Sequence, residues 1–298
     1  MTGVTASAAP GRLFCFGLGY TAEALARSLM ADGWSVAGTC REAARCDELA
    51  ALGIDAWLFD GEQAMADPVA ALAGATHLLA SAPPSENGDG AIFHHGLDIA
   101  EVESLDWIGY LSTTGVYGNH RGLWVDEETP TTPSGARGQH RVLAEEQWIE
   151  FWSSYGIPTQ VFRLAGIYGP GRSPLDAVRQ GGARRIDKQG QVFSRIHVDD
   201  IVTVLRAAMV RPDGGRIYNV CDDQPAPPQD AVAFACDLLG VEPPPVVAFH
   251  DAELSAMAQS FYADNKRVRN SRIKNELGVT LAYPNYETGL RALLDNES

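Results

Sequence analysis

Residues 13–84 alternate between short apolar runs and segments whose apolar residues recur with helical spacing. The apolar runs predict strands at 13–17, 34–40, 54–60 and 76–84, and the segments between them predict helices at 21–33, 42–53 and 67–74. A repeated strand–helix–strand pattern favours a parallel sheet covered by helices on both faces. Because such crossovers are right-handed, we expect an α/β fold with a Rossmann-type doubly wound parallel sheet.

The second half of the chain continues this pattern less regularly. It predicts strands at 107–118, 157–171 and 216–220, and helices at 140–156 and 197–210. From about residue 222 proline-rich stretches surround a helical segment, which indicates a smaller lobe. We therefore expect a Rossmann domain at 1–170, its sheet completed by 196–220, and a C-terminal substrate-binding lobe at 171–298.

Charge and cysteine usage restrict the partners and the compartment. The formal net charge of -15 argues against a nucleic-acid backbone or an anionic membrane as partner. Residues 1–12 lack the basic start and long apolar run of a signal peptide. The five cysteines are scattered and have no metal-ligand spacing, which predicts reduced thiols, no metal and a cytoplasmic protein; they stand at Cys15, Cys40, Cys46, Cys221 and Cys236.

A glycine-rich loop joins the first predicted strand to the first helix. Its residues fit the pattern GxGxxA in the strand-to-helix context that a dinucleotide-binding motif requires. Gly17 permits a tight turn, Gly19 allows the backbone to approach a pyrophosphate, and Ala22 allows close helix–strand packing. With Tyr20 and Thr21 they form a candidate cofactor-binding loop at a helix N-terminus; the alternative is a tight turn without a ligand.

The end of the second strand predicts which dinucleotide binds. An acidic residue about 20 positions after the glycines favours NAD, whereas an arginine accommodates the 2′-phosphate of NADP. Arg41 stands at that place, so we expect NADP rather than NAD, although Glu42 follows directly and Arg41 could be an ordinary helix-surface residue. Asp60, at the end of the third strand, is a candidate for the adenine side or else a turn residue.

Six stretches in order resemble the extended short-chain dehydrogenase/reductases, the NAD-dependent epimerase/dehydratase group. The chain looks most like their atypical members with a GxGxxA loop. The matching stretches span residues 13–290 and read FGLGYTAEALARSL, YLSTTGVYG, FRLAGIYGPGR, RIHVDDI, YNVCDD and NKRVRNSRIKNELG. The resemblance implies a nicotinamide cofactor, a small-molecule substrate and a C-terminal lobe that closes over it.

The resemblance also assigns expected roles to individual residues. Thr113, three residues before the VYG stretch, takes the place of the catalytic Ser/Thr, unless it is a strand-end threonine bonded to the backbone. Ala82 and Pro83 take the place of a loop against the cofactor. Members of the RxxGxYGP stretch are expected to line the cleft, and His197 starts a helix whose role is structural; that stretch contributes Arg163, Tyr168, Gly169 and Pro170.

The chain departs from the family at its YxxxK motif. The family has a glutamate four residues after the lysine, and Glu145 fits it, so Arg141 takes the lysine position and Arg137 the tyrosine position. Arginine does not deprotonate in proteins, so Arg137 cannot be a general acid near neutral pH. The pair could hold the nicotinamide ribose, clamp an anion or stabilise an oxyanion. The alternative is two solvent-facing arginines offset by acidic neighbours.

Two functional hypotheses follow. The first is an NADP-dependent oxidoreductase or epimerase for a small polar, sugar-like or anionic substrate, using Thr113, Arg137 and Arg141, with a proton from water, His140 or the substrate. The second is a non-catalytic NADP-binding redox sensor or regulatory protein. Because related proteins often pair through the corresponding helix, we expect a homodimer through the helix at 140–155.

Overall fold

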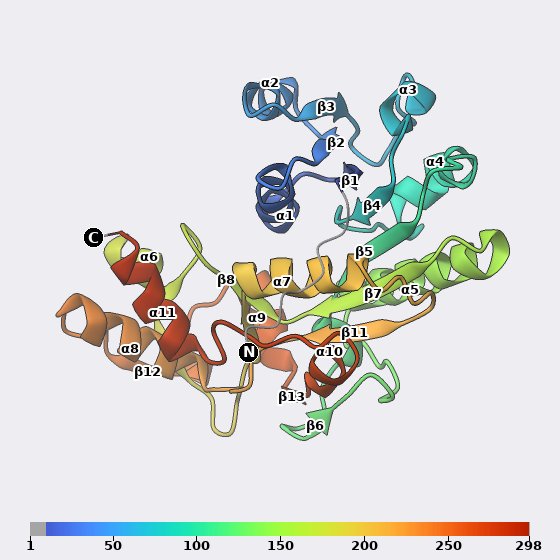
Figure 1. The fold of residues 1–298 in the computed structure, drawn as a ribbon. Helices are drawn as coiled ribbons and strands as arrows, with labels where there is room; N and C mark the ends of the chain where they lie inside the picture. The colour runs from blue at the N-terminus through green and yellow to red at the C-terminus, as the bar shows by residue number, and fades with distance from the viewer. Residues whose placement is uncertain (1–9, 298) are drawn as a thin grey trace.

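The fold is organised around one seven-stranded parallel sheet (Figure 1). The computed structural model describes residues 10–297, apart from the side chains of residues 256 and 257, so most of the stretch examined for a signal peptide lies outside it. Along the sheet the strand order is β11-β7-β5-β4-β1-β2-β3. Their bounds are β1 Arg12–Phe16, β2 Ser35–Cys40, β3 Asp55–Leu58, β4 His77–Ala80, β5 Trp107–Thr113, β7 Thr159–Leu164 and β11 Ile217–Val220.

This order confirms the predicted doubly wound fold. The chain starts at β1, moves outward through β2 and β3, and then returns to the other side of β1 with β4. The strand order therefore reverses beside β1, and ligands of such sheets bind at that switch point, outside the carboxyl ends of the strands. The β1 residues 13–16 are fully buried, as expected for a strand covered on both faces.

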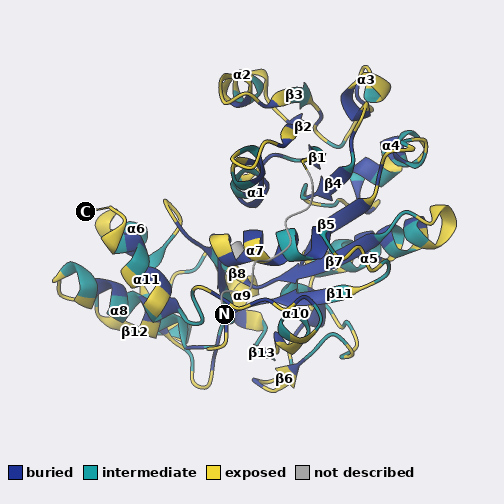
Figure 2. Ribbon diagram, viewed as in Figure 1, coloured by how far each residue is buried: buried dark blue, intermediate teal, exposed yellow. Residues whose placement is uncertain are grey.

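Helices cover both faces of the sheet and create two apolar cores (Figures 1 and 2). One core receives α1 Tyr20–Met30, α2 Ala43–Ala51 and α7 Val198–Met209. The other receives α3 Pro68–Leu72, α4 Gly90–Ala100 and α5 Ala136–Tyr155. The helix α4 was not predicted from the sequence; it begins after the buried Asp89, whose side chain caps it.

A smaller lobe lies beside the carboxyl end of the sheet (Figure 1). It holds a third apolar core, to which Leu175, Ala231 and Leu290 contribute. Its elements are α6 Pro174–Arg179, β9 Arg185–Asp187, α8 Pro228–Leu239, β12 Val246–Ala248, the short 3₁₀ helix η2 Phe249–Asp251, α9 Ala256–Ala263 and α11 Tyr286–Asp295, and two short strands join it to the sheet, β8 Gly166–Tyr168 and β10 Arg195–His197. The division at residue 170 stays a prediction.

After α9 the chain leaves this lobe a second time and returns to the sheet before α11. β13 Arg267–Val268 pairs in parallel with β6 Trp124–Val125, and α10 Ser271–Asn275 packs beside β11. Val268 and Ile273 belong to the first apolar core rather than to that of the small lobe. Residues just before β13 are thereby held close to the loop that follows β5. No helix within residues 10–297 is both long and apolar enough to cross a membrane.

Candidate functional site

The glycine loop has the geometry that a dinucleotide requires. Gly17 has a φ of +90°, and a Cβ there would lie 3.0 Å from the amide nitrogen of Ala82, so a larger residue is excluded by both conformation and space. The Gly17 amide donates to Thr39 Oγ1 at 2.8 Å, which fastens the loop to the end of β2. A Cβ on Gly19 would meet no described atom within 4 Å, so this position faces open space.

The first helix presents its N-terminus to that open space. Gly19 is its N-cap and supplies no side-chain hydrogen bond to the first-turn amides, while Tyr20 and Thr21 line the adjacent cleft. Ala22 is fully buried, in the helix–sheet contact predicted for it. Unfilled N–H groups together with the helix dipole favour an anion. The pyrophosphate of a nicotinamide dinucleotide therefore fits the residues that are present.

The two residues predicted for the adenosine end lie on the surface. Arg41 directly follows β2 and is exposed, as is Glu42. Asp60 is also exposed, and its Oδ1 accepts hydrogen bonds from the amides of Glu62 and Gln63. These bonds lower the pKa of the Asp60 carboxyl. The contacts of Asp60 are those of the turn-residue alternative, and neither side chain lines the large cleft described below.

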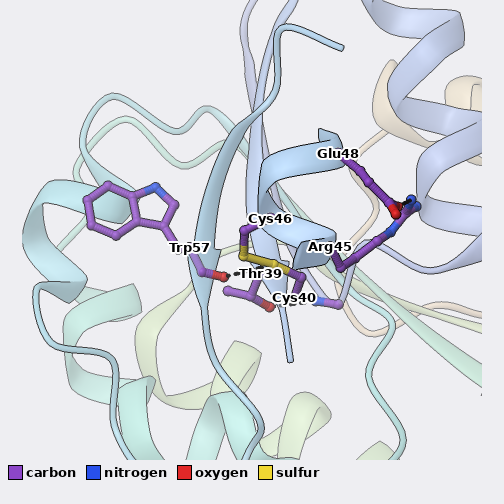
Figure 3. Close-up of a disulfide and its surroundings, with 7 residues drawn as sticks. Thr39, Cys40, Arg45, Cys46, Glu48 and Trp57 are labelled. Atoms are coloured by element: carbon purple, nitrogen blue, oxygen red, sulfur yellow. Dashed lines mark hydrogen bonds and ion pairs between the residues drawn. A yellow bond between two sulfur atoms is a disulfide. The ribbon is translucent and has the colours of Figure 1, made fainter. Parts of the chain in front are cut away.

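The prediction that all cysteines are reduced thiols is wrong for one pair. Cys40, the last residue of β2, forms a disulfide with Cys46 in α2 (Figure 3). The remaining cysteines are free and buried, namely Cys15, Cys221 and Cys236. The cysteines have no metal-ligand or CxxC spacing, and spacing alone did not indicate that a strand end and the following helix bring two thiols together. Cys40 lies between Arg41 and Thr39 in the sequence, and Thr39 anchors the glycine loop.

A cleft of about 1610 Å³ runs between the carboxyl edge of the sheet and the small lobe. It exceeds the roughly 300–1,000 Å³ of common small-molecule pockets, leaving room for a cofactor and a substrate together. Seven of the predicted site residues line it, Gly19, Tyr20, Thr21, Pro83, Thr113, Arg137 and Arg141. The others are outside the lining, Gly17, Ala22, Arg41, Asp60 and Ala82.

Thr113 is positioned at the point where β5 enters the short 3₁₀ helix η1, Thr114–Tyr117. Its Oγ1 accepts a hydrogen bond from the Gly115 amide at 3.1 Å. That bond fixes the side chain and leaves the hydroxyl proton available for a ligand in the cleft. The backbone-bonded alternative and the catalytic one are therefore compatible in this geometry.

The two arginines of α5 have different environments. Arg141 Nη1 donates to the Leu111 carbonyl at 2.6 Å and to the Tyr110 hydroxyl at 3.2 Å, so its guanidinium is anchored at the end of β5. Arg137 is exposed in the first turn of α5 and lines the cleft. The guanidinium of Arg141 is thus held by the protein, whereas that of Arg137 is available to a ligand in the cleft. His140 is not among the lining residues, which leaves it without contact to the cleft.

A buried polar network supports the wall behind these residues. Glu145 accepts hydrogen bonds from Arg163 and from the Ser112 hydroxyl, and Arg163 also donates to the Tyr117 hydroxyl at 2.9 Å. Tyr117 in turn donates to Asn219 Oδ1 at 2.8 Å. The expectation that Arg163 lines the cleft is wrong, because its side chain is occupied by these buried partners; Gly169 and Pro170 are also outside the lining, while Tyr168 is within it.

His197 has the structural role expected for it. It is the N-cap of α7, and its Nδ1 accepts a hydrogen bond from the Asp199 amide. The ring packs against Tyr168 and Tyr283, and burial lowers the pKa of its imidazole. A residue so enclosed caps a helix rather than transferring protons to a ligand.

Three further cations in the cleft were missed by sequence reasoning. Arg172, Arg195 and Lys266 line it from the side of the small lobe and of the segment before β13. Arg172 lies over the Tyr20 ring, and Arg195 over the Tyr286 ring. They stand in separate segments, so no spacing along the chain groups them with Arg137. Their gathering in a strongly acidic protein makes the cleft suited to an anionic ligand.

Comparisons with known proteins agree with this geometry. The sequence profile of the NAD dependent epimerase/dehydratase family matches residues 17–221. Protein YeeZ of Escherichia coli strain K12 is 32% identical over 279 residues, covering 90% of this chain and 94% of YeeZ. A solved structure of a functionally unknown conserved protein from Silicibacter pomeroyi is 52% identical, with a TM-score of 0.88 over 96% of this chain and 99% of the other.

A more distant structure shares the fold alone. The dTDP-glucose 4,6-dehydratase of Bacillus anthracis, solved in complex with NAD, is 17% identical with a TM-score of 0.75. The alignment covers 96% of both chains. The small lobe and the sheet therefore occur together in the same arrangement elsewhere.

Proposed function

This chain belongs to the NAD dependent epimerase/dehydratase family of extended short-chain dehydrogenase/reductases, and we propose that it is an NADP-dependent oxidoreductase or epimerase of the atypical GxGxxA subgroup. The observation that carries the proposal is the single cleft that joins the N-terminus of α1 to Thr113 and Arg137. A binding surface for a dinucleotide and a polar reaction centre are thus parts of one space.

The preference for NADP rests on Arg41. It follows the strand end at which this fold reads the adenosine ribose, and its guanidinium suits the 2′-phosphate that NADP carries. The disulfide beside Arg41 holds the strand end against α2, which limits how far that residue can move.

The geometry of the cleft supports the reaction roles that we propose for its residues. A bound nicotinamide supplies or accepts a hydride. Thr113 donates a hydrogen bond to the reacting oxygen of the substrate, and Arg137 stabilises negative charge that develops there or binds an anionic group of the substrate. Arg141, anchored at the end of β5, orients the nicotinamide ribose.

The substrate class follows from the charges of the lining. Four basic side chains beyond Arg141 line the cleft, Arg137, Arg172, Arg195 and Lys266, against two carboxylates, Asp176 and Asp264. Asp176 is used in the capping box of α6. We therefore propose a small polar substrate with a carboxylate, phosphate or sugar-like group.

A second candidate function is a non-catalytic NADP(H)-binding redox sensor or regulatory protein. The arginine in the tyrosine position favours it, since arginine cannot deliver the proton that carbonyl reduction needs. For either function we propose a cytoplasmic homodimer paired through α5. Disulfides are uncommon in reducing compartments. In the cytoplasm the Cys40–Cys46 bond would therefore have to resist reduction by cellular thiols.

Calorimetric titration with NADPH and NADH tests the cofactor assignment. We expect NADPH to bind more tightly than NADH, and Arg41→Ala to abolish that difference while leaving NADH binding unchanged. Arg216→Ala, at an exposed arginine beside the amino end of β11, is the matched control. Equal binding of both dinucleotides by the wild-type protein would refute the preference for NADP.

Turnover then separates the two functions. NADPH oxidation is followed with a panel of anionic and sugar-like carbonyl compounds, using wild-type protein and Arg137→Ala. Loss of turnover in the variant with retained NADPH affinity supports the enzyme. NADPH binding without turnover of any carbonyl compound by the wild-type protein favours the sensor.

A further inference from the structure

The family's tyrosine position holds an arginine, so carbonyl reduction in this cleft needs another proton donor. We propose that Lys266 is that donor, an inference that rests on the proposed oxidoreductase function. It is a lysine from the far end of the sequence, brought beside the Thr113 turn by the β6–β13 pairing.

The position of Lys266 is fixed by the backbone around it. The Asn265 carbonyl accepts hydrogen bonds from the His120 and Gly122 amides at 3.0 and 2.9 Å, and β13 begins two residues later. Lys266 Nζ then donates to the Gly118 carbonyl at 3.0 Å. Gly118 closes the 3₁₀ turn that starts at Thr113, so the ammonium lies against the turn that positions the reacting oxygen.

The same group adjoins the segment that carries Arg137. The Ser134 hydroxyl donates to Asp264 at 2.7 Å, and Asp264 pairs with Lys266 at 3.5 Å. A Cβ on Gly138 would lie 3.3 Å from the Gly115 carbonyl, which shows how closely the first turn of α5 packs on the Thr113 turn. Lys266 therefore stands between the two parts of the wall that the family uses for its threonine and its tyrosine.

Comparison with the histidines, arginines and tyrosines of the chain favours the same residue. No histidine within the described chain lines the cleft. Arginines do not release a proton near neutral pH. Burial raises the pKa of each lining tyrosine, which makes it a weaker acid; they are Tyr20, Tyr168, Tyr262 and Tyr286.

The pKa of Lys266 is shifted in the opposite direction from the pKa values of these tyrosines. Only 11% of its side chain is exposed, and burial lowers the pKa of its ammonium, while the Asp264 carboxylate partly opposes that effect. Arg137 and Arg141 are the charged side chains that the adjoining helix α5 contributes to the cleft lining. A buried lysine whose pKa falls toward neutral is a better proton donor, because its proton is released more readily at working pH.

The proton balance is simple. When the carbonyl carbon of the substrate gains a hydride from NADPH, which is thereby oxidised to NADP⁺, the electron pair of the C=O π bond moves to the oxygen. Lys266 gives that oxygen one proton and becomes a neutral amine, and Thr113 holds the oxygen during the transfer. Solvent at the cleft mouth returns a proton to Lys266, so the alcohol product carries one hydride and one proton.

The chain offers an unusually direct test, because it has three lysines, Lys188, Lys266 and Lys274. Protein labelled with ¹³C at lysine Cε gives three signals, assigned with the single lysine-to-arginine variants and titrated by NMR. We expect the Lys266 signal to have a midpoint below the ordinary value of about 10.4. A midpoint at or above that value would overturn the inference.

Two substitutions separate proton donation from packing or charge. Lys266→Met removes the proton, and Lys266→Arg keeps the charge but cannot release a proton near neutral pH. Both are expected to lower kcat for NADPH-dependent carbonyl reduction by about 10²–10⁴-fold with an unchanged Kd for NADPH. Lys274→Met, at a lysine paired with Asp223 outside the cleft, is the control and should keep the wild-type rate.

The outcomes distinguish this inference from the proposed function. Turnover by the wild-type protein with a wild-type rate in Lys266→Arg would show that only the charge matters, and the inference alone would fail. NADPH binding without turnover of any carbonyl compound would remove the oxidoreductase function and the inference with it. Loss of turnover in both Lys266 variants, together with a lowered NMR midpoint, supports the assignment.

Discussion

Arg163 and Glu145 form a buried ion pair behind the cleft, with Arg163 Nη2 2.7 Å from Glu145 Oε2. Arg163 Nε approaches both carboxylate oxygens as well, at 3.1 and 3.2 Å. The pair joins α5 to β7, so it holds the helix that carries Arg137 and Arg141 against the sheet. From the sequence, Glu145 served only to align Arg137 and Arg141 with the YxxxK motif of the family.

Removing half of this pair should be costly. Glu145→Gln leaves the buried Arg163 charge without its counter-ion, and breaking a buried pair in this way typically costs about 3–5 kcal/mol. We expect a loss of that size in the free energy of unfolding, measured by urea denaturation. Glu146→Gln, at an exposed neighbour on the same helix, should change it by less than about 0.5 kcal/mol. Equal losses in the two variants would contradict the assigned role.

The two loop glycines should respond differently to the same substitution. Gly17→Ser forces a side chain into a positive φ and against Ala82, and should cost about 1–3 kcal/mol of stability. Gly19→Ser enters open space at a helix N-cap, where serine is favoured, so the fold should be retained.

Nucleotide binding is the second property to measure in the Gly19→Ser variant. A side chain at position 19 occupies the space through which the pyrophosphate approaches the backbone, so NADPH affinity should fall by about tenfold or more, or about 1.4 kcal/mol. Calorimetry of the folded Gly19→Ser protein measures this directly. Undiminished NADPH binding by that variant would place the pyrophosphate elsewhere.

The Cys40–Cys46 disulfide should contribute measurably to stability. It closes a short loop with a sequence separation of 6, and the chain-entropy relation gives about 2 kcal/mol for a loop of that length. We expect Cys46→Ser to lower the free energy of unfolding by that amount, and dithiothreitol to destabilise the wild-type protein but not the variant. Five reactive thiols in denatured, unreduced wild-type protein would show that the bond is absent.

Stability should also depend on the protonation of Asp222. Its side chain is almost fully buried, and its Oδ2 accepts no hydrogen bond from the described residues. Burial raises the pKa of its carboxyl to about 8, against about 3.9 in an unfolded chain. Between these values the folded state binds the extra proton, so stability falls as pH rises from about 4 to about 8.

Asp222→Asn removes this titration while keeping the shape of the side chain. The fall in the free energy of unfolding between pH 4 and pH 8 should therefore be smaller in the variant than in the wild-type protein. Asp295→Asn makes the same chemical change at an exposed site at the end of α11 and controls for the change in net charge. Parallel pH profiles for wild-type protein and Asp222→Asn would rule out the raised pKa.

Local patterns predicted the Rossmann half well because their physical causes are local. Apolar runs and helical spacing reflect burial against a sheet, and the loop at Gly17 needs only the residues on either side of it. The α5 register was also set locally, since Glu145 lies four residues after Arg141. The helix α4 was missed because its apolar residues are mixed with histidines and glycines, and its position depends on the buried Asp89 and Trp148.

The sequence by itself determined the α/β fold, the glycine loop and the replacement of the family tyrosine by Arg137. Only the tertiary structure decided that Arg163 supports the cleft from behind, that Cys40 and Cys46 are joined, and that Lys266 reaches Gly118. The physical reason is range. Hydrophobic periodicity and turn chemistry depend on residues that are near neighbours in the sequence. The cleft is lined by side chains from segments more than a hundred residues apart, and no local sequence pattern predicts that these segments lie close together.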